Sequence, residues 1–152
     1  MQRIVAKLVI GLAITSIGMY GSDSDIGTWQ FNPAKSTPSN LKSRIEVIEA
    51  TPDGRMKVTR TELRVDGINR TFSFTFKYDG KEYPVTGGTF DAIAQERIDA
   101  NTTTFDVKMT GTAYHASGSF TVSRDGKTRT QIDKGIGRDG KPFELTRIYE
   151  KQ

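Results

Sequence analysis

The 152-residue sequence predicts an all-β fold, in which a single antiparallel up-and-down meander closes into a small barrel of 8–10 strands after an N-terminal signal peptide. Two observations predict the meander: Asp-Gly pairs recur along the chain, and the segments between them alternate apolar and polar residues. Asp-Gly readily supplies the positive φ angles of tight hairpin turns. A meander leaves two exposed edges unless it closes, which favours a barrel. The pairs are Asp53-Gly54, Asp66-Gly67, Asp79-Gly80, Asp125-Gly126 and Asp139-Gly140.

The N-terminal segment differs in composition from the rest of the chain. Arg3 and Lys7 precede an apolar stretch over residues 8–19, and the first acidic residue is Asp23. This layout is typical of a secretory signal peptide, and the stretch is short for a membrane span, which needs roughly 20 residues. An uncleaved N-terminal anchor is the alternative.

We therefore divide the chain into a signal peptide over residues 1–21 and one calycin-like β-barrel domain over residues 22–152. Small residues predict cleavage after Gly18 or after Gly21. Export implies a periplasmic or extracellular location. The sequence has no cysteine, which excludes a disulfide and a cysteine-linked lipid.

Charge is evenly distributed along the barrel domain. The whole chain has 22 basic and 18 acidic residues, and Lys and Arg alternate with Asp and Glu along most of the expected strands. Nucleic-acid-binding proteins instead gather basic residues on one face. We therefore expect a solvated barrel exterior and no nucleic acid as a partner.

The segments between turn signals set the expected strands. No stretch of the barrel domain keeps a helical period, and the best helical candidate, the linker over residues 33–41, has room for one or two turns. Tyr83-Pro84 marks an edge strand or a bend, because proline cannot donate to a sheet ladder. We expect strands at about residues 27–32, 43–50, 56–65, 69–78, 82–86, 89–98, 103–109, 112–123, 128–136 and 142–150.

Alternation along the strands assigns side chains to the interior, because successive side chains point to opposite faces of a sheet. Four aromatic residues share one face of the strand over residues 69–78, and we expect them to line the interior. Two later strands add apolar residues to this wall, and Ala116 and Gly118 are expected to leave room opposite it. The expected interior residues are Phe72, Phe74, Phe76, Tyr78, Phe105, Val107, Met109, Tyr114, Phe120 and Val122.

The strand over residues 56–65 does not follow one alternation. Met56 and Val58 share one face, whereas the apolar residues near its end lie on the other. A β-bulge near Arg60 or Thr61 would reconcile the two halves, and small barrels often bend at such points.

An arginine interrupts the apolar face of the last strand, which carries Phe143, Leu145, Arg147 and Tyr149. A buried guanidinium group needs a partner. One interpretation stacks Arg147 on Trp29, the only tryptophan, because the first and last strands are neighbours if the barrel closes. The other makes Arg147 and Tyr149 a clamp for a ligand carboxylate inside the barrel.

At these residues the chain resembles the calycin superfamily, which includes the lipocalins and the intracellular fatty-acid-binding proteins. The resemblance rests on Gly27-Thr28-Trp29 in the first strand and Thr146-Arg147-Ile148-Tyr149-Glu150 in the last. The lipocalin pattern implies a structural seam in which Gly27 and Trp29 pack under Arg147. The fatty-acid-binding-protein pattern implies instead that Arg147 and Tyr149 hold the ligand carboxylate.

The longer opening over residues 27–36 is also similar to that of small exported bacterial proteins of uncharacterised function. Two features depart from the superfamily. Residues 33–42 are too few for the helix-turn-helix lid of fatty-acid-binding proteins, and the chain lacks the Thr-Asp-Tyr motif of typical lipocalins.

Catalysis and metal binding have little support in the sequence. His115 is the only histidine and there is no cysteine, so no zinc-ligand spacing exists and a serine triad would depend on that one imidazole. His115 also falls on the polar face of its strand. We therefore predict no enzyme activity, no catalytic residue, no metal and no cofactor.

A membrane-embedded barrel fits less well than a water-soluble one. An outer-membrane barrel needs an outward apolar band with aromatic girdles, and the long charged side chains of the opposite face would then crowd a narrow lumen. The chain also ends in Glu150-Lys151-Gln152 rather than in an aromatic residue.

The sequence thus predicts an exported barrel that binds a small apolar or amphipathic molecule, with a carboxylate group as the favoured polar part. The alternative is a barrel with a solid core that acts as a protein-interaction or inhibitor module in the cell envelope and has a protein partner. An eight-stranded barrel can be packed solid or hold one small ligand. The expected ligand-binding residues are Arg147, Tyr149, Phe72, Phe74, Phe76, Tyr78, Phe105, Tyr114 and Phe120.

Overall fold

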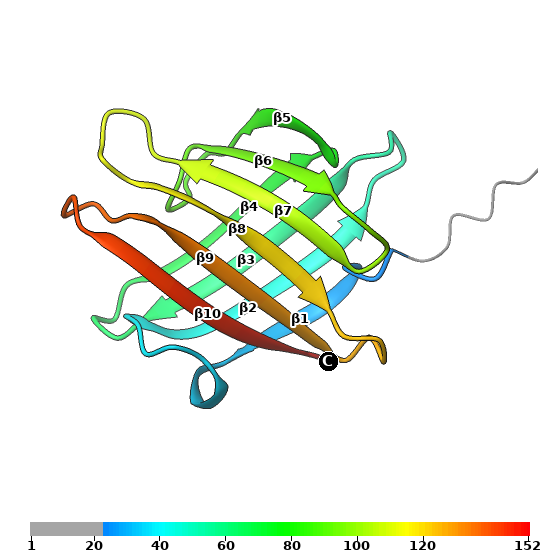
Figure 1. Ribbon diagram of the computed structural model, residues 1–152, viewed down its shortest axis with the longest axis horizontal. Coiled ribbons are helices and arrows are strands. Elements are labelled where there is room, and N and C mark those ends of the chain that lie inside the picture. The colour runs from blue at the N-terminus through cyan, green and yellow to red at the C-terminus, as the bar shows by residue number, and fades with distance from the viewer. Residues whose placement is uncertain (1–22) are drawn as a thin grey trace, which may run out of the picture.

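The computed structural model describes residues 23–152, and the predicted signal peptide, with its cleavage sites after Gly18 or Gly21, lies outside the described residues. Ten antiparallel strands form a single sheet, which confirms the all-β meander (Figure 1). A single 3-10 turn, η1 (Pro33–Lys35), follows the first strand. The strands are β1 (Gly27–Asn32), β2 (Leu41–Ala50), β3 (Met56–Arg64), β4 (Asn69–Phe76), β5 (Asp79–Pro84), β6 (Ala92–Arg97), β7 (Thr102–Lys108), β8 (His115–Val122), β9 (Thr128–Ile136) and β10 (Pro142–Lys151).

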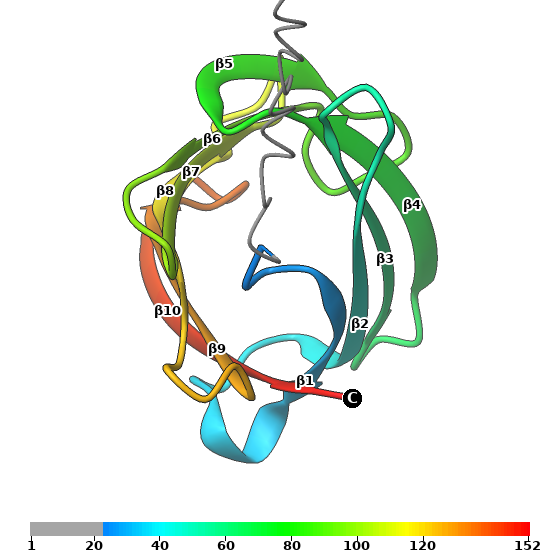
Figure 2. The ribbon, with the colours of Figure 1, turned by 90° about the vertical axis from the view of Figure 1, so that its right-hand side faces the viewer.

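The sheet curls into a ring because β1 and β10, the two ends of the meander, pair with each other. Figure 2 looks along the barrel and shows this ring. The seam pairs Trp29 with Lys151 and Phe31 with Tyr149. Strands that are adjacent in the chain are paired everywhere except between β4 and β5. The barrel is therefore nearly closed, with one gap.

Four of the Asp-Gly pairs form the hairpin turns that the sequence predicts. Gly54, Gly67, Gly126 and Gly140 have φ angles between 71° and 85°, and each joins two paired strands. Gly80 also has a positive φ angle, but it lies within β5, where the register against β6 is irregular. The expected hairpin at this fifth pair is wrong, because the chain crosses the gap of the barrel there.

Aromatic side chains cover the gap between β4 and β5. Phe90, in the loop before β6, packs edge-on against Phe72 and Phe74, with ring centroids 6.0 and 5.6 Å apart. Gly88 lies so close to β4 that an added Cβ would be 2.8 Å from the Phe72 ring. Side chains of this loop thus close what the backbone leaves open.

The predicted aromatic wall lies in the core, but the expected room opposite it is absent. An added Cβ on Gly118 would lie 1.8 Å from the carbonyl oxygen of Ile132, so the backbone of β9 fills that space. The wall residues Phe72, Phe74, Phe76, Phe105 and Phe120 are buried, and Tyr78 and Tyr114 pack against them while partly buried.

Strand β3 alternates without a bulge, contrary to the expectation near Arg60 or Thr61. It pairs with β4 in one continuous register, and the register shift lies at the start of β2 instead. Met56, Val58, Arg60 and Glu62 are all buried on the inward face. The second half of the strand therefore carries charges into the barrel, because partners on neighbouring strands neutralise them.

Candidate ligand-binding site

Charged side chains occupy much of the barrel interior. They project from β2, β3, β9 and β10 on the faces that alternation turns inward, and Asp25 joins them from the segment before β1. Their formal charges balance, since four guanidinium groups meet four carboxylates. The group comprises Arg44, Arg60, Arg129, Arg147, Asp25, Glu46, Glu62 and Asp133.

Glu46 is the centre of this network. Its two carboxylate oxygens lie 2.9 Å from Arg60 Nη2 and 2.8 Å from Arg129 Nη1. Burial raises the pKa of Glu46, but the surrounding guanidinium groups, those of Arg60 and Arg129 foremost, outweigh it and lower this pKa to about 2. Glu46 is therefore ionised at neutral pH and joins β3 to β9 across the interior.

Tyr149 belongs to the same polar interior. Arg44 donates from Nε and Nη2 to Glu62 at 3.1 and 2.8 Å, and from Nη1 to the Tyr149 hydroxyl at 3.0 Å. The Tyr149 hydroxyl in turn donates to Gln131 Oε1 at 3.1 Å. The hydroxyl therefore has a protein donor and a protein acceptor already.

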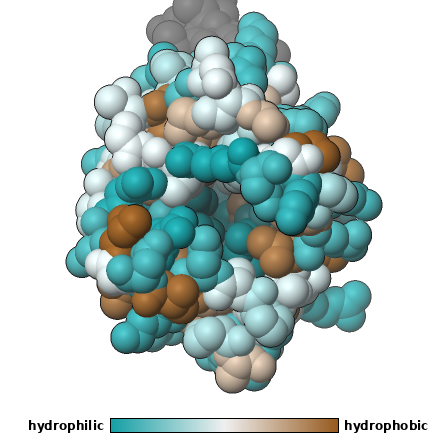
Figure 3. All heavy atoms as spheres, turned by 90° about the vertical axis from the view of Figure 1, so that its left-hand side faces the viewer, coloured by the Kyte–Doolittle hydropathy of each residue, from teal (hydrophilic) through white to brown (hydrophobic). Residues whose placement is uncertain are grey.

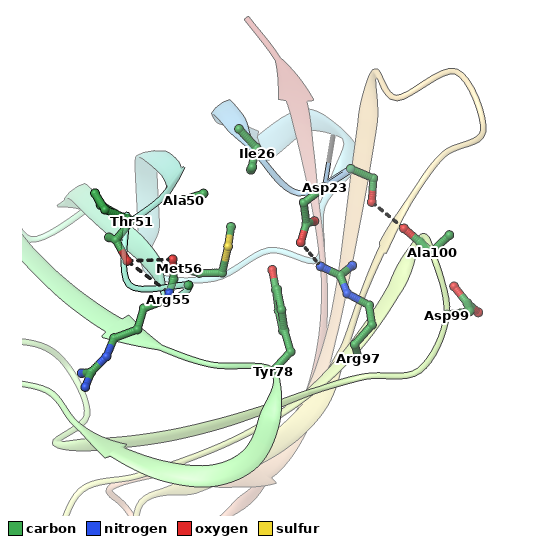
Figure 4. Close-up of a pocket in the computed structure, with 13 residues that line it drawn as sticks. Asp23, Ile26, Ala50, Thr51, Arg55, Met56, Tyr78, Arg97, Asp99 and Ala100 are labelled. Atoms are coloured by element: carbon green, nitrogen blue, oxygen red, sulfur yellow. Dashed lines mark hydrogen bonds and ion pairs between the residues drawn. The ribbon is translucent and has the colours of Figure 1, made fainter. Parts of the chain in front are cut away.

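One end of the barrel, where β1 begins, carries a hollow of about 820 Å³ (Figure 4). Its walls are mainly apolar and include Ile26 and Tyr78. The Tyr78 hydroxyl donates to Asp25 Oδ2 at 3.0 Å, and Arg97 pairs with Asp23 at the rim. Burial and then the Asp25 carboxylate raise the pKa of Tyr78, which keeps it a neutral donor. The polar groups of this hollow thus bind one another.

The opposite end carries a hollow of about 590 Å³ with a different lining, which we call the arginine-lined hollow. Figure 3 faces this end and shows a depression with a mostly hydrophilic rim. On its wall the rings of Tyr114 and Phe143 lie parallel, with centroids 6.5 Å apart. Its residues include the apolar or aromatic Leu41, Ile68, Tyr114, Phe143 and Leu145, the basic Arg44, Arg64, Arg70, Arg138 and Arg147, and the acidic Glu62, Asp133 and Asp139.

A cavity of about 50 Å³, which we call the inner cavity, adjoins the arginine-lined hollow. The two share Arg44, Tyr114, Asp133 and Arg147 among their lining residues. Arg60 lines only the inner cavity, at its deeper side. The hollow therefore leads toward the charged network of the interior.

The predicted contact between Arg147 and Trp29 is absent. Lys151 pairs with Trp29 across the seam, and its Nζ lies 5.0 Å from the centre of the indole ring. An added Cβ on Gly27 would lie 2.5 Å from Lys151 Cε. Arg147 instead donates from Nη1 to both oxygens of Asp133, at 2.8 and 2.7 Å. The register of β1 against β10 thus gives the seam a lysine in place of the expected arginine.

The structure distributes the predicted ligand-binding residues over three places. Arg147 and Tyr114 line both the arginine-lined hollow and the inner cavity, whereas Tyr149 is 0% exposed and lines neither. Arg147 and Tyr149 therefore do not meet as a free carboxylate clamp. Phe105 and Phe120 line the inner cavity, Tyr78 lines the hollow at the other end, and Phe72, Phe74 and Phe76 pack between the two ends.

The interior arginines of β2, β3 and β9 were missed by the sequence analysis. A signal was present, because Arg44 and Glu46 stand on the same face of β2 as the buried Ile48. Arg60 likewise continues the inward face of Met56. Charged residues two apart on an apolar face, with opposite charges in the adjacent strand, are the pattern that identifies a paired interior.

Two features of the predictions concern metals and membranes. Within residues 23–152, no group of three or more His, Cys, Asp and Glu side chains is arranged to hold a metal ion. Among the same residues, no helix has the length and apolarity needed to cross a membrane. His115 is exposed on β8.

Comparisons with known proteins give a fold and no family. No protein-family model matches the sequence, and no curated protein sequence matches it significantly. The fluorescent protein UnaG has a similar structure, with a TM-score of 0.58, 11% identity, and coverage of 85% of this chain and 98% of its own. Zebrafish ileal bile acid-binding protein, complexed with cholic acid, is similar at a TM-score of 0.51 and 14% identity, with coverage of 85% and 99%. The chain shares their barrel fold.

Proposed function

We propose that this chain is an exported binding protein for a small amphipathic molecule with an anionic group, which it takes up in the arginine-lined hollow. The observation that carries the proposal is the composition of that hollow, whose aromatic and aliphatic wall faces guanidinium groups from four strands and a turn. Small-molecule sites usually combine an apolar wall with a few polar groups of this kind.

Cations without carboxylate partners favour an anionic ligand. Arg64 pairs with Asp66 and Arg147 with Asp133. Arg70 and Arg138 form no ion pair with any residue that the structure describes. Guanidinium groups recognise carboxylates through charge-assisted hydrogen bonds, so these two side chains are the first candidates to meet the ligand.

The structural neighbours support binding rather than a specific ligand. The bile acid-binding protein has the same barrel and binds cholic acid, which is itself an amphipathic acid. Export rests on the predicted signal peptide and not on the fold. The proposal assigns no catalytic residue and no cofactor.

Displacement of an environment-sensitive fluorescent probe tests the proposal. We expect saturable binding of long-chain carboxylates or cholic acid, and weaker binding of the matched alcohols. Replacing both Arg70 and Arg138 by glutamine should weaken carboxylate binding about tenfold, the loss of roughly 1.4 kcal/mol of charge-assisted contacts, and should leave alcohol binding unchanged. The double variant Arg55→Gln and Arg124→Gln, which removes two exposed arginines outside this hollow, is the matched control.

A second function is favoured by one observation, the dense aromatic packing between the two ends. Phe74 lies 6.1 Å from Phe76 and 5.6 Å from Phe90 between ring centroids, and Phe105 lies 4.8 Å from Phe120. A barrel with this solid middle also suits a protein-interaction or inhibitor module. Absence of saturable binding by any amphipath in the displacement assay would favour that module over the ligand carrier.

A further inference from the structure

The inner cavity contains hydrogen-bond donors that have no partner. The Nε groups of Arg60 and Arg147 are buried and bond to no described residue, and both arginines line this cavity. Arg60 is only 6% exposed. A buried N–H group without an acceptor is costly, so such donors usually meet water or a ligand.

The lining of this cavity is positively charged. Arg44, Arg60 and Arg147 are its basic residues, whereas Asp133 is its one carboxylate. Glu46, the partner of Arg60, also serves Arg129. Burial lowers the pKa of Arg60 and, although Glu46 opposes this, Arg44 lowers it further. A negative charge in the cavity would therefore stabilise the guanidinium form of Arg60.

The size of the cavity limits what can enter. About 50 Å³ exceeds the roughly 10–15 Å³ that one water molecule needs, and it suits a halide or a single carboxylate group. Phe105, Phe120 and Ile93 supply the apolar remainder of the wall. Because apolar walls lower the local dielectric, an anion there interacts more strongly with a guanidinium group than it would in water.

We propose that the inner cavity is a binding site for a small monovalent anion, a halide or a carboxylate group, held by the Nε groups of Arg60 and Arg147. The site goes beyond the proposed function, since a free ion can fill it when no amphipath is bound. It also differs from the clamp implied by the sequence, because Tyr149 takes no part and an arginine of β3 does. The carboxylate of a ligand in the arginine-lined hollow is the other source of the same chemistry.

Arginine Nε–H signals in nitrogen-15 NMR spectra test this site directly. The purified full chain, kept at constant ionic strength with sulfate, is titrated with sodium chloride and sodium formate. Separate samples receive a long-chain carboxylate or its matched alcohol. We expect saturable shifts of the Arg60 and Arg147 signals, with little change in the Nε signal of Arg44, which already bonds to Glu62 at 3.1 Å.

Two variants define the role of Arg60. Arg60→Lys retains the positive charge but removes the Nε donor, and we expect the anion affinity measured at Arg147 to fall about tenfold or more. Arg55→Lys, at an exposed turn, is the matched control and should leave the affinity unchanged. If Arg60→Lys does not fold, the titration of the unmodified chain decides.

Each outcome separates the sources. Saturation by chloride or formate alone supports the site with a free ion as its occupant. Shifts that only the long-chain carboxylate causes, and its alcohol does not, support the site with a ligand group as its occupant. If no anion moves the two signals, the cavity holds water only and the proposal is overturned, even where probe displacement still detects a ligand in the hollow. Saturation by formate without any probe displacement would instead overturn only the proposed function.

Discussion

Lys151 covers the ring of Trp29, with its Nζ 5.0 Å from the ring centre, and the two residues are direct partners across the β1–β10 seam. This contact lies where the two ends of the meander meet. Trp29 is 0% exposed, and its Nε1 donates to the carbonyl oxygen of Asp25 at 2.7 Å. The seam is therefore fixed by a cation over the ring and by a hydrogen bond at its edge.

Lys151→Ala should destabilise this seam modestly. We expect a loss of about 0.5–1 kcal/mol in the free energy of unfolding, the range for a cation–π contact at an exposed site. Urea unfolding followed by emission of the only tryptophan measures it. Lys57→Ala, which removes an exposed lysine from β3, is the control. Equal stability of the two variants would show that the contact contributes nothing.

Glu46→Gln should destabilise the barrel far more, because it leaves the buried guanidinium groups of Arg60 and Arg129 without a shared carboxylate. Breaking a buried ion pair from one side costs about 3–5 kcal/mol. Chemical unfolding at pH 7 checks this value. Glu49→Gln, an exposed position on the same strand, serves as the control. A loss below about 1 kcal/mol would mean that the network does not hold the interior together.

The same carboxylate predicts a dependence on pH. Its pKa falls from 4.5 to about 2 on folding, so Glu46 contributes stability that is fully present above pH 4.5 and is lost as the pH falls toward 2. The contribution is about 3 kcal/mol for a shift of this size. The difference in unfolding free energy between the unmodified chain and Glu46→Gln should therefore shrink between pH 5 and pH 2. A constant difference over that window would contradict the assignment.

Phe90→Ala should open the gap between β4 and β5. The side chain packs on Phe72 and Phe74, and loss of a buried phenylalanine costs about 3–5 kcal/mol. Because the edge of β4 has no strand partner there, its amide hydrogens should also exchange faster. Ile98→Ala, at a position that is 57% exposed, is the control. Unchanged exchange on β4 would argue that the loop does not seal the barrel.

Local signals carried most of the fold. Asp-Gly requires little beyond its own two residues to form a hairpin turn, so the turns at Gly54, Gly67, Gly126 and Gly140 could be predicted. The turn chemistry at Gly80 is the same, yet no hairpin forms. Whether two adjacent strands pair depends on the curvature of the whole sheet, which no local pattern contains.

The interior charges show the other limit of the sequence. Arg60 became acceptable inside the barrel only because Glu46 lies within 2.9 Å of it, and the chain separation of the two residues hides that contact. Arg147 was correctly expected to need a partner. The identity of that partner depended on register, which places Asp133 beside Arg147 and Lys151 beside Trp29.

Native mass spectrometry of protein purified from its own source tests the central claim, binding of a small anionic amphipath, most directly. The account predicts a bound species of low mass that leaves on denaturation and carries an acidic group. After its removal, added long-chain carboxylate should restore the complex, and the Arg70→Gln, Arg138→Gln double variant should hold it less well. A bare protein mass both as purified and after incubation with carboxylates would contradict the account.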